Sequence, residues 1–295
     1  MGHGHGHGHA HDSGSAGLLR WVLAANLIFF VVELSAGLWS SSLALVSDAG
    51  HALGDSGALF LALVADVISR QPATRRASFG LVRARVLGAF LNGLALAAIG
   101  GGVLTEAVQR VIQAPPPPPA GIVIGVGLAG LVLNLGSAAL LARGRRDLNI
   151  RGALTHVLVD ALGSAAAVAA GVALSLGFTR ADSVVALVMA ALVLRVAWLL
   201  LRDAASVLLE VAPSGVDPDR VREVLTAVPG VLDVHDLHVW SLDGEHALVS
   251  VHLRTAASDA FAPVQSAAHQ ALERLHVHHR TLQVEVDCSG GCTPN

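Results

Sequence analysis

The sequence predicts an α-helical membrane protein with six transmembrane helices, followed by a small α+β domain on the cytoplasmic side. Of the 295 residues, 53% are hydrophobic and only 14% are charged. The mean hydropathy of +0.62 is higher than that of ordinary soluble domains. Charged residues concentrate after position 210, whereas the preceding part is rich in Leu, Val, Ala and Gly. We therefore expect a membrane part and a smaller soluble part.

Six apolar runs are each long enough to cross a bilayer, which takes about 20 residues as a helix. They cover residues 18–39, 43–69, 83–112, 120–142, 151–176 and 183–202. The expected organisation is an N-terminal tail over 1–17, a transmembrane domain over 18–208, a cytoplasmic domain over 209–288 and a short tail over 289–295.

Arginine is concentrated in two of the connections between these runs. Residues 70–85 and 143–151 are rich in arginine, whereas each of the other three connections holds at most one. By the positive-inside rule the arginine-rich connections face the cytoplasm, and an even number of spans places both termini there too. The run Pro115 to Pro119 lacks backbone donors, so it ends the third helix and forms an outer loop. We expect an integral protein of a bacterial inner membrane.

Two helices of the membrane part each carry a histidine and an aspartate four residues apart. In SDAGHALGDSGA, His51 and Asp55 share one face of the second helix. In GALTHVLVDALGS, His156 and Asp160 repeat this spacing on the fifth helix. Two imidazoles and two carboxylates that face each other form a tetrahedral ligand set that suits zinc. A bound divalent cation would also neutralise two carboxylates that are costly inside a membrane.

A packing role is the alternative, in which each histidine hydrogen-bonds to its own aspartate or to the backbone at a helix interface. For one pair the two interpretations are evenly balanced. A second pair of identical spacing favours a functional site, which is the default for ionisable residues inside a membrane. Histidine and carboxylate ligands can be protonated near neutral pH, so they can release metal in exchange for protons. This chemistry favours transport over a permanent structural ion.

Further polar residues interrupt the apolar helices. Asp48 lies three residues before His51, on nearly the same helix face, and is a candidate for supporting a ligand or for the ion path. Others can hydrogen-bond the ring N–H of a ligating histidine or link helices directly. These are Asn26, Glu33, Glu106 and Asn134.

The soluble part has the order helix, strand, strand, helix, strand. Helical spacing covers 216–228 and 264–275, and alternation covers 234–242, 247–254 and 281–287. This αββαβ order predicts an open-faced α+β sandwich. It is too small to bury much surface alone, which favours dimerisation through this domain.

Histidines in the soluble part suggest a second metal site. Glu285 and Asp287 share one face of the last predicted strand, and His252 lies on a neighbouring strand, so the three can converge on a metal. Solvated surface histidines and a solvated strand face are the alternative.

The two ends of the chain carry metal-binding residue types outside any predicted element. In MGHGHGHGHAHD, His and Gly alternate from His3 to His11. We expect this segment to be disordered, and flexible imidazoles make it a candidate zinc collector, with a purification tag as the alternative. The only cysteines, Cys288 and Cys292, are too few for a disulfide framework.

Five motifs are spread over nearly the whole chain: SSSLALVSDAGHALGD, RRASFGLVRARVLGAFLNG, ALTHVLVDALGS, LLEVAPSGVD and VHDLHVWSL. Through these motifs the sequence resembles the cation diffusion facilitators, in particular their zinc-exporting branch. Two positions depart from the family pattern. Relatives often carry an acidic residue where this chain has Arg85, and an aromatic residue where it has Leu81.

The resemblance implies a proton-coupled antiporter that is a homodimer with a ferredoxin-like cytoplasmic domain. The transport site it implies consists of His51, Asp55, His156 and Asp160. The matching positions of the cytoplasmic metal site are His235, His252, Glu285 and Asp287.

We therefore predict a transporter that exports zinc from the cytoplasm in exchange for protons and is not an enzyme. Zinc is the substrate and also a candidate structural or regulatory ion, with cobalt and cadmium as open alternatives, and no organic cofactor is expected. An intramembrane zinc metalloenzyme is a competing prediction, but it needs an open metal position and a motif such as His-Glu-x-x-His, which the sequence lacks. A membrane-anchored metal sensor is another. A net charge of −3 argues against nucleic acid as a partner.

Overall fold

The computed structural model describes residues 13–142, 148–277 and 279–286, and the side chains of 13–23, 55, 56, 58, 59 and 148–153 are outside the description. Several predicted features therefore lie outside the described residues. They are the histidine-rich tail over 1–12, the segment 143–147 of the second arginine-rich connection, Asp287, Cys288 and Cys292.

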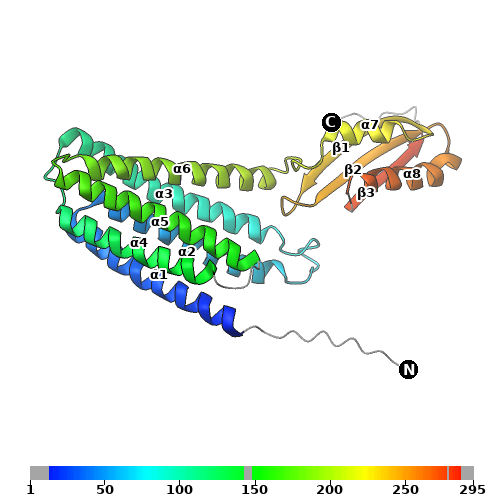
Figure 1. Ribbon diagram of the computed structural model, residues 1–295. Coiled ribbons are helices and arrows are strands. Elements are labelled where there is room, and N and C mark those ends of the chain that lie inside the picture. The colour runs from blue at the N-terminus through cyan, green and yellow to red at the C-terminus, as the bar shows by residue number, and fades with distance from the viewer. Residues whose placement is uncertain (1–12, 143–147, 278, 287–295) are drawn as a thin grey trace, which may run out of the picture. The chain divides into compact units, whose positions relative to one another are not determined.

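Six long helices make up the first two thirds of the chain (Figure 1). They are α1 (Ser13–Ser40), α2 (Leu43–Ser69), α3 (Ala84–Gln113), α4 (Ala120–Ala142), α5 (Leu148–Ser175) and α6 (Ala181–Leu208). Each coincides with one of the predicted apolar runs, so the prediction of a helical membrane domain is confirmed.

Four of these helices are long and apolar enough to cross a membrane over the described residues. They are Ala84–Gln113, Ala120–Ala142, Leu154–Ser175 and Ala181–Leu208, and the shorter apolar stretches Ala24–Ser40 and Phe60–Ser69 lie in α1 and α2. The number of six spans stays a prediction.

Large apolar side chains are exposed on the surfaces of these helices. Leu162 is 72% exposed, Val132 69% and Trp198 67%. Exposed apolar area on this scale would be unfavourable in water, but it is the normal surface of a helix in contact with lipid.

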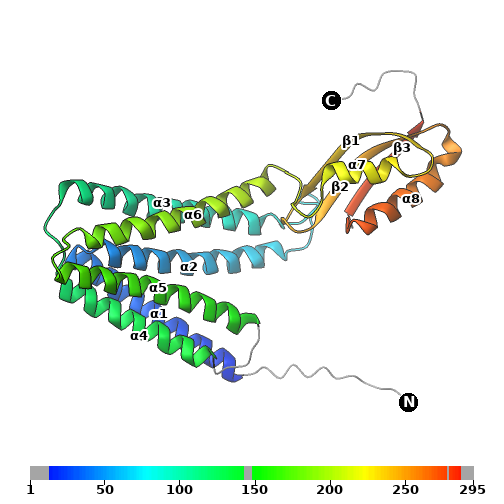
Figure 2. The ribbon, with the colours of Figure 1, turned by 45° about the horizontal axis from the view of Figure 1, so that its top comes forward.

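The chain divides into two compact units, of which the first contains residues 1–57 and 95–196. In this unit α1, α4 and α5 lie side by side in both views (Figures 1 and 2). Gly130 of α4 makes the close approach possible. A Cβ atom there would lie 2.6 Å from Phe29 Cζ of α1 and 2.8 Å from Ser164 Oγ of α5. Small residues commonly allow such close packing in membrane helices.

Asp182, in the first turn of α6, caps the beginning of α2. Its Oδ2 accepts a hydrogen bond of 2.7 Å from the backbone N–H of Leu43, and its Oδ1 accepts one of 3.4 Å from that of Ala44. The hydroxyl of Ser42 also donates to Asp182. Because the first N–H groups of a helix have no partner within it, a carboxylate at this position satisfies and stabilises the helix end. The carboxylate is itself buried, with 1% of the residue exposed.

The second unit, residues 58–94 and 197–295, contains the predicted αββαβ domain. Its elements are α7 (Pro218–Thr226), β1 (Val231–Ser241), β2 (Ala247–Thr255), a short 3-10 helix (Ser258–Ala260), α8 (Phe261–Arg274) and β3 (His279–Val286). The sheet order is β1-β2-β3, with β1 antiparallel and β3 parallel to β2. Asp217 begins α7 by accepting a 3.0 Å hydrogen bond from the N–H of Asp219.

The two helices of this domain and one face of the sheet form its core. Val221 and Leu225 of α7 and Leu272 of α8 are fully buried in the same cluster as Val249 and Val251 of β2. Because side chains alternate along a strand, the other face of β2 carries His252. This face is not covered by α7 or α8, and it also carries His235, the neighbour of His252 on β1.

We expect Asp182→Asn to destabilise the helical domain by about 1–2 kcal/mol. The amide replaces one acceptor oxygen with an NH2 group. This donor would face the N–H and O–H donors at the beginning of α2, so hydrogen bonds there would be lost. Thermal unfolding of the purified protein in detergent should show a lower midpoint. Asp203→Asn, at an exposed position of the same helix, is the control, and equal midpoints for the two variants would contradict the capping role.

Candidate functional site

The two predicted ligand pairs lie on α2 and α5, as expected. On α5, His156 Nε2 is 3.6 Å from Asp160 Oδ2, so these side chains do share one helix face. On α2, His51 is partly buried, and the side chain of Asp55 is outside the description. Among the residues whose side chains are described, His51, His156 and Asp160 are not part of any group of three ligand atoms within 4.8 Å of one another. The four-ligand set therefore stays a prediction.

A small cavity lies among α1, α2, α4 and α5 and has a volume of about 30 Å³, enough for a water molecule or an ion. Its polar lining includes the predicted ligand Asp160 and four of the five further polar residues singled out in the sequence. These polar residues are Asn26, Glu33, Asp48, Asn134, Asp160 and Ser164.

Asp48 is the centre of a hydrogen-bond network among these four helices. Ser164 Oγ of α5 donates to Asp48 Oδ2 at 3.3 Å, and Asn134 Nδ2 of α4 donates to Ser164 Oγ at 3.4 Å. The carboxyl group of Glu33 on α1 also hydrogen-bonds with that of Asp48. Direct interhelical hydrogen bonding, one of the two roles considered for these residues, is therefore present in the structure.

Sequence reasoning missed Ser164, although a signal was available. It lies four residues after Asp160, on the same face of the helix, and is 1% exposed. A small polar residue one turn beyond a predicted ligand was the only indication of its role.

Gly163 allows the carboxylate of Asp48 to lie directly against α5. A Cβ atom at Gly163 would collide with Asp48 Oδ1 and would lie 2.9 Å from its Cγ. Any larger residue at 163 must therefore displace Asp48 or separate the helices.

Three residues of the soluble domain form a second candidate metal centre. The ligand atoms of His235, His252 and Glu285 all lie within 4.8 Å of one another. His235 Nε2 is 2.8 Å from Glu285 Oε1, and His252 Nδ1 is 3.9 Å from Glu285 Oε2. The two imidazole rings meet edge to face, with 5.4 Å between their centres. The structure thus brings together three of the four predicted residues, and Asp287 lies outside the described ones.

The sheet positions this cluster. His235 and His252 are cross-strand neighbours on β1 and β2, and a bulge follows His235. In the bulge, Asp236 has a φ of 50°, which aspartate tolerates better than most residues. The bulge brings Asp236 Oδ1 to 2.9 Å from His238 Nε2 and Asp236 Oδ2 to 3.6 Å from His252 Nε2.

Two acidic residues around the cluster were not predicted as site residues. Asp233 Oδ2 lies 3.1 Å from His235 Nδ1, where it can fix the orientation of the ring. The hydrogen bond with His238, together with the nearby His252 and His235, lowers the pKa of Asp236 below its usual range. Asp236 is therefore ionised at neutral pH and adds negative charge beside His252.

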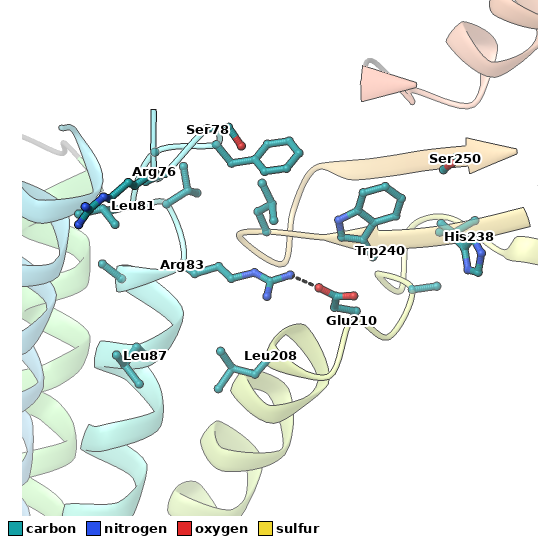
Figure 3. A pocket seen from close by; sticks show the side chains of 18 of the residues that line it. Arg76, Ser78, Leu81, Arg83, Leu87, Leu208, Glu210, His238, Trp240 and Ser250 are labelled. Atoms are coloured by element: carbon teal, nitrogen blue, oxygen red, sulfur yellow. Dashed lines mark hydrogen bonds and ion pairs between the residues drawn. The ribbon is translucent and has the colours of Figure 1, made fainter. Parts of the chain in front are cut away.

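A larger cavity of about 1280 Å³ lies within the second unit (Figure 3). Its lining includes Leu81, one of the two departures from the family pattern, and Trp240. Arg83 and Glu210 form an ion pair of 2.6 Å in this lining. Arg85, the other departure, pairs with Asp66 of α2 at 2.6 Å. The basic residue is thus accommodated by an acidic partner on a neighbouring helix.

Comparison with known protein families identifies two matching regions. Residues 19–209 match the cation efflux transmembrane domain, and residues 213–287 match the cation efflux protein cytoplasmic domain.

Three relatives illustrate the similarity of the full chain. It is 37% identical to the zinc transporter ZitB of Escherichia coli strain K12 over 285 residues, which cover 95% of this chain and 90% of the relative. It is 34% identical to the metal cation efflux system protein CzcD of Cupriavidus metallidurans, covering 92% and 87%. It is 32% identical to the cadmium, cobalt and zinc/H(+)-K(+) antiporter of Bacillus subtilis, covering 88% and 85%.

We expect Gly163→Ala to destabilise the protein by about 1–3 kcal/mol, because the added methyl group displaces the carboxylate of Asp48. Thermal unfolding in detergent measures the effect. Gly136→Ala on α4 is the matched control, since nothing lies within 4 Å of a Cβ atom there and alanine favours a helix. A midpoint for Gly163→Ala equal to or above that of the control would contradict the close contact.

Proposed function

The chain belongs to the cation efflux family, and from that premise we propose that it exports zinc from the cytoplasm in exchange for protons. The observation that carries the proposal is the repeat of the histidine–aspartate pair on α2 and α5, two helices that line one polar cavity. Asp160 of α5 and Asp48 of α2 both contribute to that cavity. We propose that His51, Asp55, His156 and Asp160 form the transport site.

The ligand types support an exchangeable zinc site. Mixed nitrogen and oxygen ligands in a tetrahedral set suit zinc, and two carboxylates balance its charge inside the membrane. Histidine must be neutral to bind a metal, so binding releases protons and protonation releases the metal. Metal moving outward and protons moving inward would therefore alternate at the same side chains.

The names of the relatives agree with this substrate and with coupling to protons. Two of them are named for zinc, and one of these is also named as an antiporter for cadmium and cobalt. Since affinity order alone does not decide selectivity among such ions, cobalt and cadmium are the competing substrates. The family is one of transporters, and the chain is not an enzyme.

We further propose the membrane arrangement. Residues 18–208 would form six spans with both termini in the cytoplasm, because the arginine-rich connections belong on that side. The domain at 209–288 would join two copies of the chain into a homodimer, in agreement with the match to the family's cytoplasmic domain. The cluster of His235, His252 and Glu285 would hold a structural or regulatory zinc ion, with Asp287 as a further ligand.

Transport is tested with purified protein in proteoliposomes under an imposed pH gradient. We expect Asp55→Asn and Asp160→Asn each to lower the rate of zinc uptake at least about tenfold, because each loses one of the carboxylates that neutralise the cation. Asp203→Asn, an exposed carboxylate on α6, should keep the wild-type rate. Unchanged flux in both site variants would refute the proposed site, and flux indifferent to the gradient would refute the antiport.

The cytoplasmic cluster is tested by counting bound zinc in full-length protein that carries Asp160→Asn, which removes the transport site. Adding Glu285→Gln should remove about one further zinc ion per chain, because the neutral amide replaces the charged carboxylate ligand that lies beside the two imidazoles. Glu245→Gln, an exposed acid in the same domain, controls for general charge loss. Equal zinc content in the two double variants would exclude the cluster as a metal site.

A further inference from the structure

Two acidic residues of the helical domain are buried beside the proposed transport site without being among its ligands. Glu33 is 2% exposed and Asp48 is 5% exposed. Both line the cavity that also contains Asp160. Among the described residues lining this cavity there is no arginine or lysine. The charge of the two carboxyl groups is therefore not balanced by a basic side chain in the cavity.

The two carboxyl groups lie within hydrogen-bonding reach of each other. Ionised carboxylates have only acceptors, so a hydrogen bond between the two requires a proton on one of them. Two carboxylates in contact do not both ionise readily, because like charges repel strongly where water is excluded. Two buried carboxyl groups at this separation are therefore suited to sharing a proton.

The neighbouring polar groups can hydrogen-bond to the pair whether or not this proton is present. Ser164 donates to Asp48 Oδ2, and a hydroxyl can donate to a carboxylate or accept from an acid by rotating. Glu33 Oε1 is buried and has no hydrogen-bond partner among the described residues. It lines a cavity that can hold water. A proton on this pair thus has an oxygen to occupy and space for a water molecule that could carry it away.

The charged groups that face the pair belong largely to the proposed transport site. Glu33 and Asp48 both interact electrostatically with Asp160 of α5, and Asp48 also interacts with His51 on its own helix. His156 lies beyond, 3.6 Å from Asp160. α4 contributes Asn134, which is neutral. A divalent cation on the ligands would therefore add two positive charges next to the pair.

We propose that Glu33 and Asp48 hold a proton that is exchanged against the transported cation. The pair is protonated while the transport site is empty. When a divalent cation binds, the O–H bond breaks, its electrons remain on the carboxylate oxygen and the proton passes to water. When the cation leaves, the pair takes up a proton again. This inference rests on the proposed function, and it assigns one exchanged proton to residues that do not ligate the metal.

The test counts the protons released when zinc binds to purified full-length protein. Calorimetric titrations in two buffers of different ionisation enthalpy at the same pH give this number directly. We expect Glu33→Gln to bind zinc but to release about one proton fewer per ion than the wild type. Asp48→Asn should show the same loss. Glu106→Gln is the control, since this acid is paired with Arg110 at 2.8 Å, and it should match the wild type.

The outcomes separate this inference from the transport proposal. If Glu33→Gln and Asp48→Asn both release as many protons as the wild type, the shared proton is excluded even when zinc flux still depends on Asp160. If Asp160→Asn leaves flux unchanged, the transport site itself fails, whatever the proton count.

A further measurement covers the case in which both variants misfold. Infrared difference spectra of the wild type, with and without zinc, should show the loss of a protonated-carboxyl C=O band. Retention of that band on zinc binding would overturn the inference.

Discussion

Carboxyl groups that are shielded from water need partners, and in the helical domain this requirement determines which helices meet. Asp182, Asp48 and Glu33 are all buried, and each makes its contacts with a different helix from its own. A buried polar group left without a partner would cost several kcal/mol. Apolar surfaces in a membrane can slide past one another with little change in free energy, because lipid is as apolar as leucine. The polar contacts therefore supply the register that apolar packing lacks.

The same requirement links packing to ion binding in this domain. Asp48 joins α2 to α1 and α5, and it lies only one turn from His51 and beside the cavity that contains Asp160. Close contact of this carboxylate with α5 depends on the missing side chain at Gly163. A change of charge at the proposed ligands would thus alter the electrostatic interactions of groups that hold the helices together. Such coupling between occupancy and helix contacts is what alternating access requires.

Local patterns predicted most of the fold. All six apolar runs became helices, as their length of about 20 residues or more predicts for membrane spans. The αββαβ order is confirmed because 3.6- and 2-residue periods reflect each element's own buried face. The pairs His51/Asp55 and His156/Asp160 were visible for the same reason, since their spacing lies within one helix.

Contacts between distant elements could not be read from these patterns. The cap on α2 joins Ser42 to Asp182, 140 positions apart, and nothing local to either residue indicates the partner. The contacts of Asp48 likewise depend on how α1 and α5 rotate about their axes, which sequence spacing leaves open. In the soluble domain, the bulge after His235 redirects Asp236, whereas strict alternation would have placed that residue on the other face of the sheet.

The position of the cytoplasmic cluster on the sheet has a thermodynamic consequence. His235, His252 and Glu285 come from β1, β2 and β3, and β1 and β3 are separated by β2. An ion held by all three would cross-link the two outer strands, β1 and β3. Along the chain, β3 follows β2 by way of α8. Such an ion would bind the folded sheet and not the separated strands. The free energy of unfolding of this domain would then rise with the logarithm of the free zinc concentration. The domain would therefore be most stable when the concentration of exportable metal is highest.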